Sequence, residues 1–130
     1  MSLSGGLDSS SLAILIYEMI NRSINKIGIE KTIKRFKIDK KIINQNNSNI
    51  IKKLCSKLLY TAYQKTENSS FKTIESSKKI SQFIGSNHYE WSIDEEVASI
   101  VKKISKKTKI NYNWEDHDIS LQNIQSRVRS

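Results

Sequence analysis

Residues 4–10 read Ser4-Gly5-Gly6-Leu7-Asp8-Ser9-Ser10, and an apolar run at 12–20 follows them directly. The two glycines permit positive φ angles and let the backbone approach another group closely. Successive backbone N–H groups in such a turn, followed at once by a helix, form a nest that suits phosphate oxygens. The three serines add hydroxyl donors to this nest. The stretch therefore predicts a phosphate-binding loop that opens a helix.

The aspartate of this loop narrows the prediction. A carboxylate repels bare phosphate, so an aspartate at position 8 favours binding only when a Mg²⁺ ion lies between its carboxylate and the phosphates. The loop also lacks the Lys-Ser or Lys-Thr pair of a Walker A motif. These features favour a pyrophosphate-cradling loop that holds ATP with Mg²⁺. The alternative is a Ser-Gly turn that merely starts a helix.

The rest of the chain alternates between helical and extended patterns. We expect a nearly all-apolar, buried helix at 12–20, a solvated insertion with some helix at about 30–53, and a low-complexity polar run at 44–49. An apolar stretch at 54–63 favours a buried strand, although its periodicity also permits a helix. A helix at 71–84 ends at Gly85, and a strand follows at 88–93. Asp94 is expected to cap a helix through Ile104, a lysine-rich loop follows, and Asp118 is expected to cap a helix at 119–129.

This order predicts an α/β fold with a Rossmann-like parallel sheet and flanking helices, in one domain over residues 1–130. In such sheets ligands bind at the carboxyl ends of the strands. The opening loop and the polar segment Thr66-Glu67-Asn68-Ser69-Ser70 both fall at that edge. They are therefore expected to share one site.

Composition limits the classes of function. The chain has 130 residues, no apolar run near the roughly 18 residues that cross a bilayer, and no visible secretion signal. A lone Cys55 fits a reducing compartment, so we expect a cytoplasmic protein without a membrane partner. The net charge of +9 could indicate a nucleic-acid partner. A bias toward Lys, Asn and Ile explains it better, since the lysines are spread along the chain.

Four segments, in order, resemble the glutamine-dependent NAD(+) synthetases, members of the N-type ATP pyrophosphatase (PP-loop) family. SGGLDSS at 4–10 resembles the signature of that larger family, and TENSS at 66–70 is similar to a stretch of the synthetases. IGSNH at 84–88 resembles their IGSYH, and LQNIQSRVR at 121–129 is similar to their LQNIQARIR. The order and number of the segments are far more specific than any one of them.

The resemblance implies a ligase reaction. ATP adenylylates the carboxylate of deamido-NAD and releases pyrophosphate, and ammonia from glutamine or a glutaminase domain then displaces AMP to give NAD. By this likeness ATP is bound by the whole opening loop, namely Ser4, Gly5, Gly6, Leu7, Asp8, Ser9 and Ser10. Ser4 and Asp8 are expected to act in catalysis, with Asp8 toward Mg²⁺. Deamido-NAD is expected to contact Glu67, Asn68, Ser69, Asn123, Arg127 and Arg129.

The sequence also departs from the synthetase pattern. Only Met1-Ser2-Leu3 stands where an apolar strand precedes the loop, Lys65 replaces a glycine, and Ile74 replaces an arginine. The glutaminase domain and the later ATP- and substrate-binding segments of the family have no counterpart in the 130 residues. We therefore expect a partial synthetase domain, which needs the missing segments for activity and is a homo-oligomer when full length.

Two other interpretations remain open from the residues alone. The opening loop would also suit another PP-loop ligase, such as a relative of GMP synthetase or of the tRNA-thiolation enzymes, although the segments at 66–70 and 121–129 argue against this. A basic nucleic-acid-binding module would explain the lysines at 31–41, but no binding motif accompanies them. His88 and His117 lack a metal-ligand spacing and are interpreted as structural or surface residues.

Overall fold

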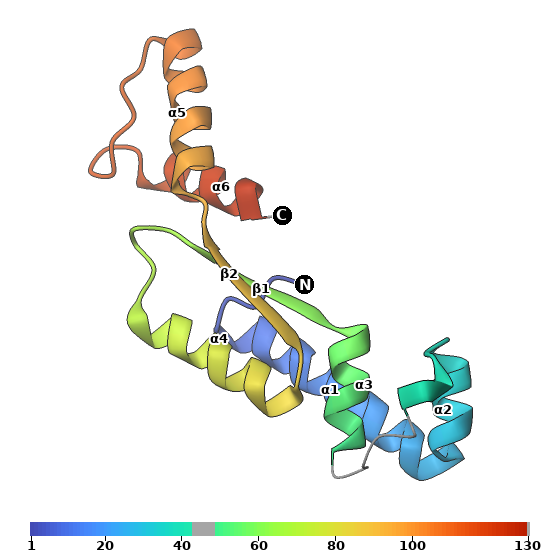
Figure 1. Cartoon of the computed structure of the whole chain (residues 1–130). Helices are drawn as coiled ribbons and strands as arrows, with labels where there is room; N and C mark the ends of the chain where they lie inside the picture. Colours follow the sequence, from blue (N-terminus) through green and yellow to red (C-terminus); the bar gives the residue numbers. More distant parts are fainter. Residues whose placement is uncertain (43–48, 130) are drawn as a thin grey trace.

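The computed structural model describes residues 1–42 and 49–129 (Figure 1). Helices dominate, and two of the elements are strands. In chain order the elements are α1 (Leu7–Ile27), α2 (Ile29–Arg35), the short 3-10 helix η1 (Lys40–Ile42), α3 (Ile50–Leu58), β1 (Tyr60–Lys65), α4 (Phe71–Ile84), β2 (Asn87–Ser92), α5 (Asp94–Thr108) and α6 (Asp118–Arg129). None of the described helices is both long and apolar enough to cross a membrane.

The sheet is parallel, as the alternating pattern predicted. β1 pairs with β2 from Tyr60 opposite Asn87 to Lys65 opposite Ser92. Met1-Ser2-Leu3 adds a short extended segment on the other side of β1, where the Leu3 N–H donates to the Ala62 carbonyl at 2.8 Å. Because Leu3 is fully buried, the strand expected before the loop is short but anchored.

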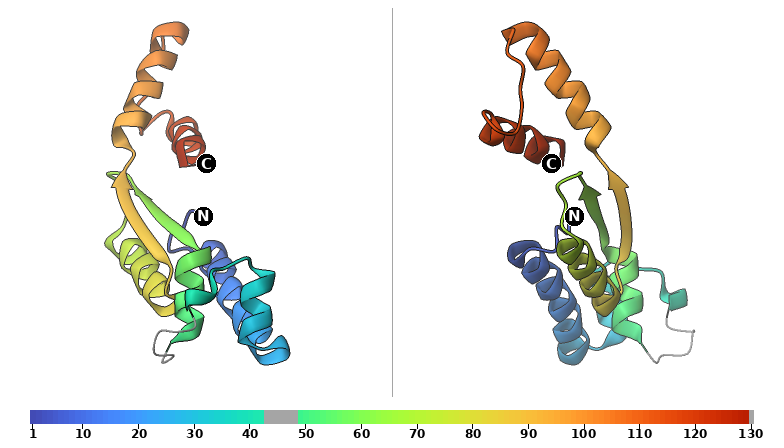
Figure 2. Two further views of the ribbon diagram at one scale, coloured as in Figure 1. Left: turned by 45° about the vertical axis from the view of Figure 1, so that its right-hand side comes forward. Right: turned by 90° about the vertical axis from the view of Figure 1, so that its left-hand side faces the viewer.

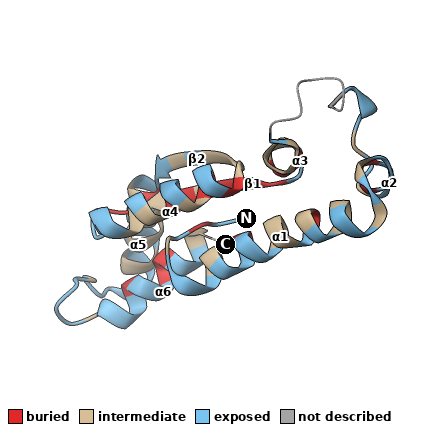
Figure 3. Cartoon of the chain, turned by 90° about the horizontal axis from the view of Figure 1, so that it is seen from below, coloured by how far each residue is buried: buried red, intermediate tan, exposed pale blue. Residues whose placement is uncertain are grey.

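Helix α1 is longer and more exposed than the sequence predicted. It begins at Leu7, directly after Gly6, and continues to Ile27. The expected burial of its apolar run is wrong for most of the run, since Leu12 is 51% and Leu15 64% exposed. Only the side that carries Ala13 and Ile20 is buried (Figure 3). Apolar periodicity indicated the helix, but its exposure depends on what packs against it.

Two apolar clusters hold the helices to the sheet and to each other. The first consists of buried Leu3, Ala13, Leu59 and Ile84 and lies beneath the strands. The second consists of buried Ile20, Ile33, Leu54 and Cys55 and joins α1, α2 and α3.

The second cluster bears on the expected insertion at about 30–53. That segment contains α2, η1 and the start of α3, and Ile33 within it is fully buried rather than solvated. That the segment is an insertion stays a prediction. The polar run expected at 44–49 lies outside the described residues except for Asn49, which precedes α3.

The interpretation of 54–63 as one strand is partly wrong. Residues up to Leu58 belong to α3, and the strand begins at Tyr60. By contrast, α4 ends where expected: Gly85 adopts a left-handed conformation with φ of 77°, and its N–H donates to the Ser81 carbonyl at 2.8 Å. The strand expected at 88–93 is β2.

Helices α5 and α6 form a separate pair beyond the carboxyl ends of the strands (Figure 1). Asp94 is the first residue of α5 rather than its N-cap, which is Ile93. The lysine-rich loop begins later than expected, because Lys106 and Lys107 lie in the last turn of α5. Helix α6 begins at Asp118, whose carboxylate accepts the Ile119 N–H at 2.7 Å.

Candidate functional site

The opening loop is held by hydrogen bonds among its own serines. The hydroxyls of Ser4 and Ser9 lie 3.0 Å apart, and the backbone N–H groups of Ser4 and Gly6 donate to the Ser9 and Ser4 hydroxyls, respectively. The Ser9 hydroxyl also donates to the Gly6 carbonyl. These bonds fix the turn that leads into α1. The Ser10 hydroxyl points inward and has no partner among the described residues.

The first N–H groups of α1 are available to a ligand. Ser10 is the first residue of the helix whose N–H finds a carbonyl, that of Gly6 at 3.2 Å, and no side chain caps the helix. The N–H groups at residues 7–9 therefore have no acceptor in the described chain. Unsatisfied N–H groups at the start of a 21-residue helix favour an anion.

The segment at 66–70 forms a compact turn between β1 and α4. The Thr66 N–H donates to the Ser69 hydroxyl at 2.9 Å, and the Ser69 N–H donates to the Thr66 carbonyl at 2.9 Å. Ser70 is the N-cap of α4, accepting the Thr73 N–H at 3.2 Å. The sequence order strand, polar turn, capped helix thus brings a second helix N-terminus to the edge at which α1 begins.

Gly5 and α4 are in direct contact. Gly5 has a φ of 73°, and a Cβ atom at this position would overlap the carbonyl oxygen of Thr73. The hydroxyl of Thr73 in turn lies 2.8 Å from the hydroxyl of buried Tyr63. β1, α4 and the opening loop are therefore locked together through Thr73.

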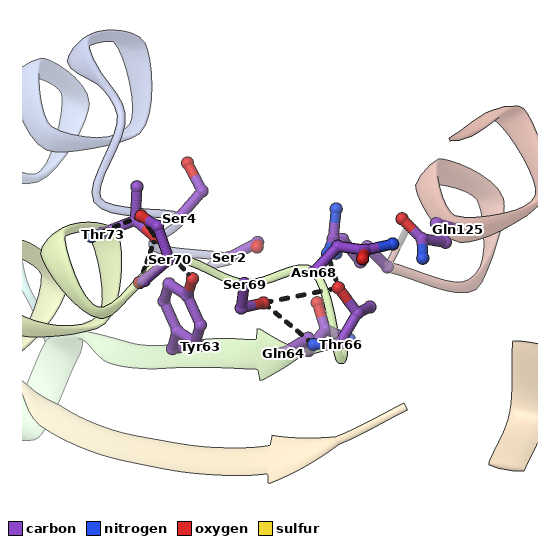
Figure 4. A pocket seen from close by; sticks show the side chains of 11 residues that line it. Ser2, Ser4, Tyr63, Gln64, Thr66, Asn68, Ser69, Ser70, Thr73 and Gln125 are labelled. Carbon is purple, nitrogen blue, oxygen red and sulfur yellow. Dashed lines mark hydrogen bonds between the residues drawn. The ribbon is translucent and has the colours of Figure 1, made fainter. Parts of the chain in front are cut away.

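A cavity of about 330 Å³ opens between these segments (Figure 4). The side chains that line it are almost all polar, and the one charged group among them is the guanidinium of Arg129. The lining consists of Ser2, Ser4, Tyr63, Gln64, Thr66, Asn68, Ser69, Ser70, Thr73, Gln125 and Arg129. Hydroxyls, amides and an arginine without any carboxylate form a lining that suits an anion.

Helix α6 closes the far side of the cavity. Gln125 points toward the turn at 66–70 in Figure 4, and the Arg129 guanidinium lies 3.4 Å from the Thr66 hydroxyl. Leu121 and Ile124 are buried and hold this face of α6 inward. Residues 63 positions apart in the sequence, Thr66 and Arg129, thus line one cavity.

Not every predicted site residue lies on this cavity. Of the opening loop, Ser4 lines it, whereas the exposed side chains of Leu7 and Asp8 do not. Asn123 and Arg127 are exposed on α6 and also lie outside the lining. The ligand-binding roles expected for these residues stay predictions.

Glu67 belongs to a neighbouring cavity of about 230 Å³. Its other walls come from α5, α6 and the loop between them, including Tyr112 and Trp114. Asn68 and Gln125 line both cavities, so the two spaces adjoin. Asp94 fixes the border between them by accepting the Glu67 N–H at 3.1 Å.

The lysine that replaces a family glycine is directed away from the cavity. Lys65 pairs with Glu90 of β2 at 2.9 Å, and Lys78 of α4 reaches the same carboxylate at 3.2 Å. Burial alone would raise the pKa of Glu90, but the hydrogen bonds from the two lysines lower it below 4.5. Lys65 therefore crosslinks the covered face of the sheet rather than entering the candidate site.

His88 belongs to a structural network. Its Nδ1 lies 2.9 Å from the Thr61 hydroxyl, which is also 3.0 Å from the Ser86 hydroxyl. Burial lowers the pKa of His88 below 6.5, so the neutral ring is favoured at pH 7. The other ring nitrogen is buried and without a hydrogen-bond partner in the described chain.

A magnesium site would depend on the nucleotide for most of its ligands. Within residues 1–42 and 49–129, no three His, Cys, Asp or Glu side chains converge on a point. The Asp8 carboxylate is exposed in the first turn of α1, beside the loop. One carboxylate plus phosphate oxygens is a donor set that Mg²⁺ accepts, so the residues present fit the ion.

Several residues that line the cavity were not predicted from the sequence to contact a ligand. Ser2, Tyr63, Gln64, Thr66, Ser70, Thr73 and Gln125 line it but were not proposed to contact a ligand. Thr66, Ser70 and Gln125 stand inside two of the segments that carry the family resemblance. These residues could have been proposed as ligand contacts, because the segments that contain them were already expected to belong to the synthetase domain.

The fold and the site define a Rossmann-like α/β protein whose cavity lies at the carboxyl ends of parallel strands. No protein-family model matches the chain. Over 99% of its length it is similar to the glutamine-dependent NAD(+) synthetases of Bos taurus (31% identity over 142 residues) and Homo sapiens (30% over 139 residues). It covers 19% of each of those relatives.

A solved structure gives the same result. The glutamine-dependent NAD(+) synthetase of Cytophaga hutchinsonii matches 99% of this chain with a TM-score of 0.88 and 36% identity, over 23% of that protein's chain. The 130 residues are therefore related to one segment of the glutamine-dependent NAD(+) synthetases. The family resemblance and the fold class predicted from the sequence are confirmed for this segment.

Proposed function

We propose that this chain provides the part of a glutamine-dependent NAD(+) synthetase that holds ATP by its phosphates. One observation carries the proposal: the polar cavity that joins the opening loop, the turn at 66–70 and α6 contains Arg129 and no carboxylate. The N-terminus of α4 borders this space through Ser70 and Thr73, and Ser4, in the loop that leads into α1, lines it as well. The dipole of α4 and the guanidinium favour a polyanion.

The reaction proposed is the amidation of deamido-NAD. The deamido-NAD carboxylate attacks the α-phosphate of ATP, the bond to the β-phosphate breaks, and pyrophosphate leaves. Ammonia then attacks the adenylylated carboxyl group, and AMP departs to leave the amide of NAD. The energetic demand on this chain is to stabilise the charge of the leaving pyrophosphate.

The residues of this chain suit that task. Ser4 and the free N–H groups at 7–9 would donate hydrogen bonds to pyrophosphate oxygens, and Arg129 would balance their charge from the opposite wall. Mg²⁺, held by Asp8 and the phosphates, would neutralise further charge when bound. Because the groups are fixed by the contact between Gly5 and Thr73, little reorganisation is needed during the reaction.

Binding calorimetry with Mg²⁺–ATP and Mg²⁺–pyrophosphate tests the proposal. We expect Arg129→Ala and Ser4→Ala to weaken both ligands by about tenfold, the loss of one charge-assisted or two neutral hydrogen bonds. Arg22→Ala is the matched control, because Arg22 is exposed and pairs with Glu18 elsewhere on α1. Wild-type chain that binds neither ligand, or Arg129→Ala that binds as tightly as wild type, would overturn the proposal.

Turnover is expected to need the remaining synthetase segments. The chain spans 19% of the curated relatives. With labelled deamido-NAD, ATP and ammonia, NAD should form only when those segments are supplied. Robust turnover by the 130 residues alone would contradict this part of the proposal.

A further inference from the structure

The net charge of the chain is concentrated in one part of the fold. Residues 18–58 include the carboxyl-terminal half of α1, all of α2, η1 and α3, and we call them the basic module. They have eleven lysines and arginines against three acids, a net charge of +8. The remaining residues have eleven against ten, a net charge of +1. The lysines are spread along the chain but the acids are not, so the basic module attracts acidic partners.

The basic module lies away from the candidate site. Figures 1 and 2 show α2 and the carboxyl end of α1 far from α6, at the opposite end of the molecule. No residue of the module lines the phosphate cavity or the neighbouring cavity of Glu67. A role in holding ATP therefore does not account for the charge of the module.

A groove on the basic module combines apolar and basic side chains. It has a volume of about 470 Å³ and lies along α1 beside the end of α2. Leu15 and Met19, four residues apart on one face of α1, are 64% and 47% exposed in it. Its other lining residues are Glu18, Arg22, Ser23, Lys26, Ile27 and Arg35. The groove thus offers apolar anchoring sites next to a group of cations.

Two of these cations are available to a partner. Glu18 and Arg22 form an ion pair at 2.8 Å, so the one acid of the lining is already neutralised. Lys26 and Arg35 are exposed, and neither side chain has a hydrogen-bond or ion-pair partner in the described chain. They come from different helices, so a bound segment can contact cations of α1 and α2 at once.

We propose that this groove docks an acidic amphipathic helix of another protein. Its apolar side chains would pack on Leu15 and Met19, and its carboxylates would pair with Lys26 and Arg35. Amphipathic helices bind apolar grooves through anchors spaced one turn apart, which matches the spacing of Leu15 and Met19. A nucleic acid fits less well, because its phosphates would meet the cations but leave both apolar side chains in water.

Fluorescence anisotropy of a labelled synthetic peptide tests the proposal. The probe has about 18 residues, roughly five helical turns, with leucines on one face and glutamates on the others, and blocked ends. No nucleotide is added. We expect saturable binding that weakens as salt is raised, because opposite charges attract the two partners. A second peptide with lysine at every glutamate position keeps the apolar face and should not bind.

Three variants locate the contact. Met19→Glu places a carboxylate among the apolar side chains of the groove, and Arg35→Glu reverses one unpaired cation. Each should weaken binding of the glutamate peptide by about tenfold or more. Lys72→Glu is the matched control, because it changes the net charge as much as Arg35→Glu does, at an exposed residue of α4 outside the groove. It should change the affinity by less than about twofold, and circular dichroism verifies the fold of each variant.

The outcomes separate this proposal from others. No saturable binding of the glutamate peptide, or binding that Met19→Glu and Arg35→Glu leave unchanged, overturns it. Tighter binding to a random-sequence RNA duplex or to vesicles of anionic phospholipid also overturns it, because the module would then select its partner by charge alone. Dimers of the chain that Met19→Glu abolishes would mean that the groove holds a second copy. Since nucleotide is absent, failure of the phosphate site leaves these measurements unaffected.

Discussion

The alpha carbon of Gly5 lies so close to the carbonyl oxygen of Thr73 that a side chain on Gly5 would overlap it. Gly5 also has a φ of 73°, in the left-handed region that favours glycine. The loop therefore depends on glycine for two reasons, backbone conformation and space. Thr73 belongs to the first turn of α4, so the contact sets the distance between the two helix N-termini at the cavity.

Gly5→Ala should separate the loop from α4. We expect a loss of about 1–3 kcal/mol in the free energy of unfolding from the φ angle and the clash together, and at least tenfold weaker Mg²⁺–ATP binding. Urea denaturation and calorimetry measure the two effects. Gly28→Ala is the control, because Gly28 has a φ of 82° with no atom near its would-be Cβ. Gly28→Ala should lose stability from the φ angle alone and keep its affinity for Mg²⁺–ATP. If both variants weaken Mg²⁺–ATP binding equally, the contact between Gly5 and Thr73 does not support the site.

The hydroxyl of Tyr63 secures Thr73 from the other side. Tyr63 is 5% exposed, and its hydroxyl lies 2.8 Å from that of Thr73. Tyr63→Phe removes this one bond while Thr73 keeps its bond to the Ser70 carbonyl at 2.9 Å. We expect a loss of about 1 kcal/mol in urea denaturation. Tyr60→Phe, at a side chain that is 55% exposed, should change stability little. A similar loss in Tyr60→Phe would show that the loss in Tyr63→Phe does not come from the bond to Thr73.

Ion pairs of Glu90 should make stability depend on pH. The folded chain lowers the pKa of Glu90 below 4.5, so its contribution is fully present above pH 4.5 and is lost as pH falls through the folded pKa. Glu90→Gln removes that contribution at every pH. The difference in unfolding free energy between wild type and Glu90→Gln should therefore be constant from pH 7 to 5 and shrink below 4.5. A difference that grows on acidification would reverse the assigned sign.

Local signals predicted the elements whose ends are marked in the sequence. Ser70 and Gly85 bracket α4 because a capping hydroxyl and a left-handed glycine act within one turn of the helix. The boundary between α3 and β1 has no such marker. Apolar residues run through 54–63 in both elements, so their pattern alone does not show that Leu54 and Cys55 are helical and pack against Ile20 and Ile33 while the strand begins only at Tyr60.

The site was predictable only as far as its segments could be identified one by one. The opening loop and the turn at 66–70 were identified, but the role of Thr73 as the contact between them depends on the packing of α4 against Gly5. Likewise Gln125 faces the cavity because buried Leu121 and Ile124 fix the rotation of α6, whereas Asn123 lies outside the lining and its contact with deamido-NAD stays a prediction. The burial expected for α1 failed for a related reason: Leu12 and Leu15 have no neighbour in the described residues that covers them.

The single cysteine offers a test of the second apolar cluster. Cys55 is fully buried beside Ile20, Ile33 and Leu54, and burial raises its pKa to about 11. At pH 8 only roughly one thiol in a thousand would then be a thiolate, so both access and ionisation oppose alkylation. We expect iodoacetamide to modify the native chain far more slowly than the chain in denaturing urea. The reaction rate should follow the unfolded fraction across the transition.

Ile33→Ala provides the matched variant for this experiment. It opens a cavity beside the thiol in the cluster that joins α1, α2 and α3 and should cost about 2–5 kcal/mol. Modification should accelerate with the unfolded fraction, by about tenfold for each 1.4 kcal/mol of stability that the variant loses. Leu15→Ala, an exposed truncation on the same helix as Ile20, should leave the rate unchanged. Rapid labelling of the wild-type chain without urea would mean that α1 and α2 do not cover Cys55, and that 30–53 lies in solvent as the sequence first indicated.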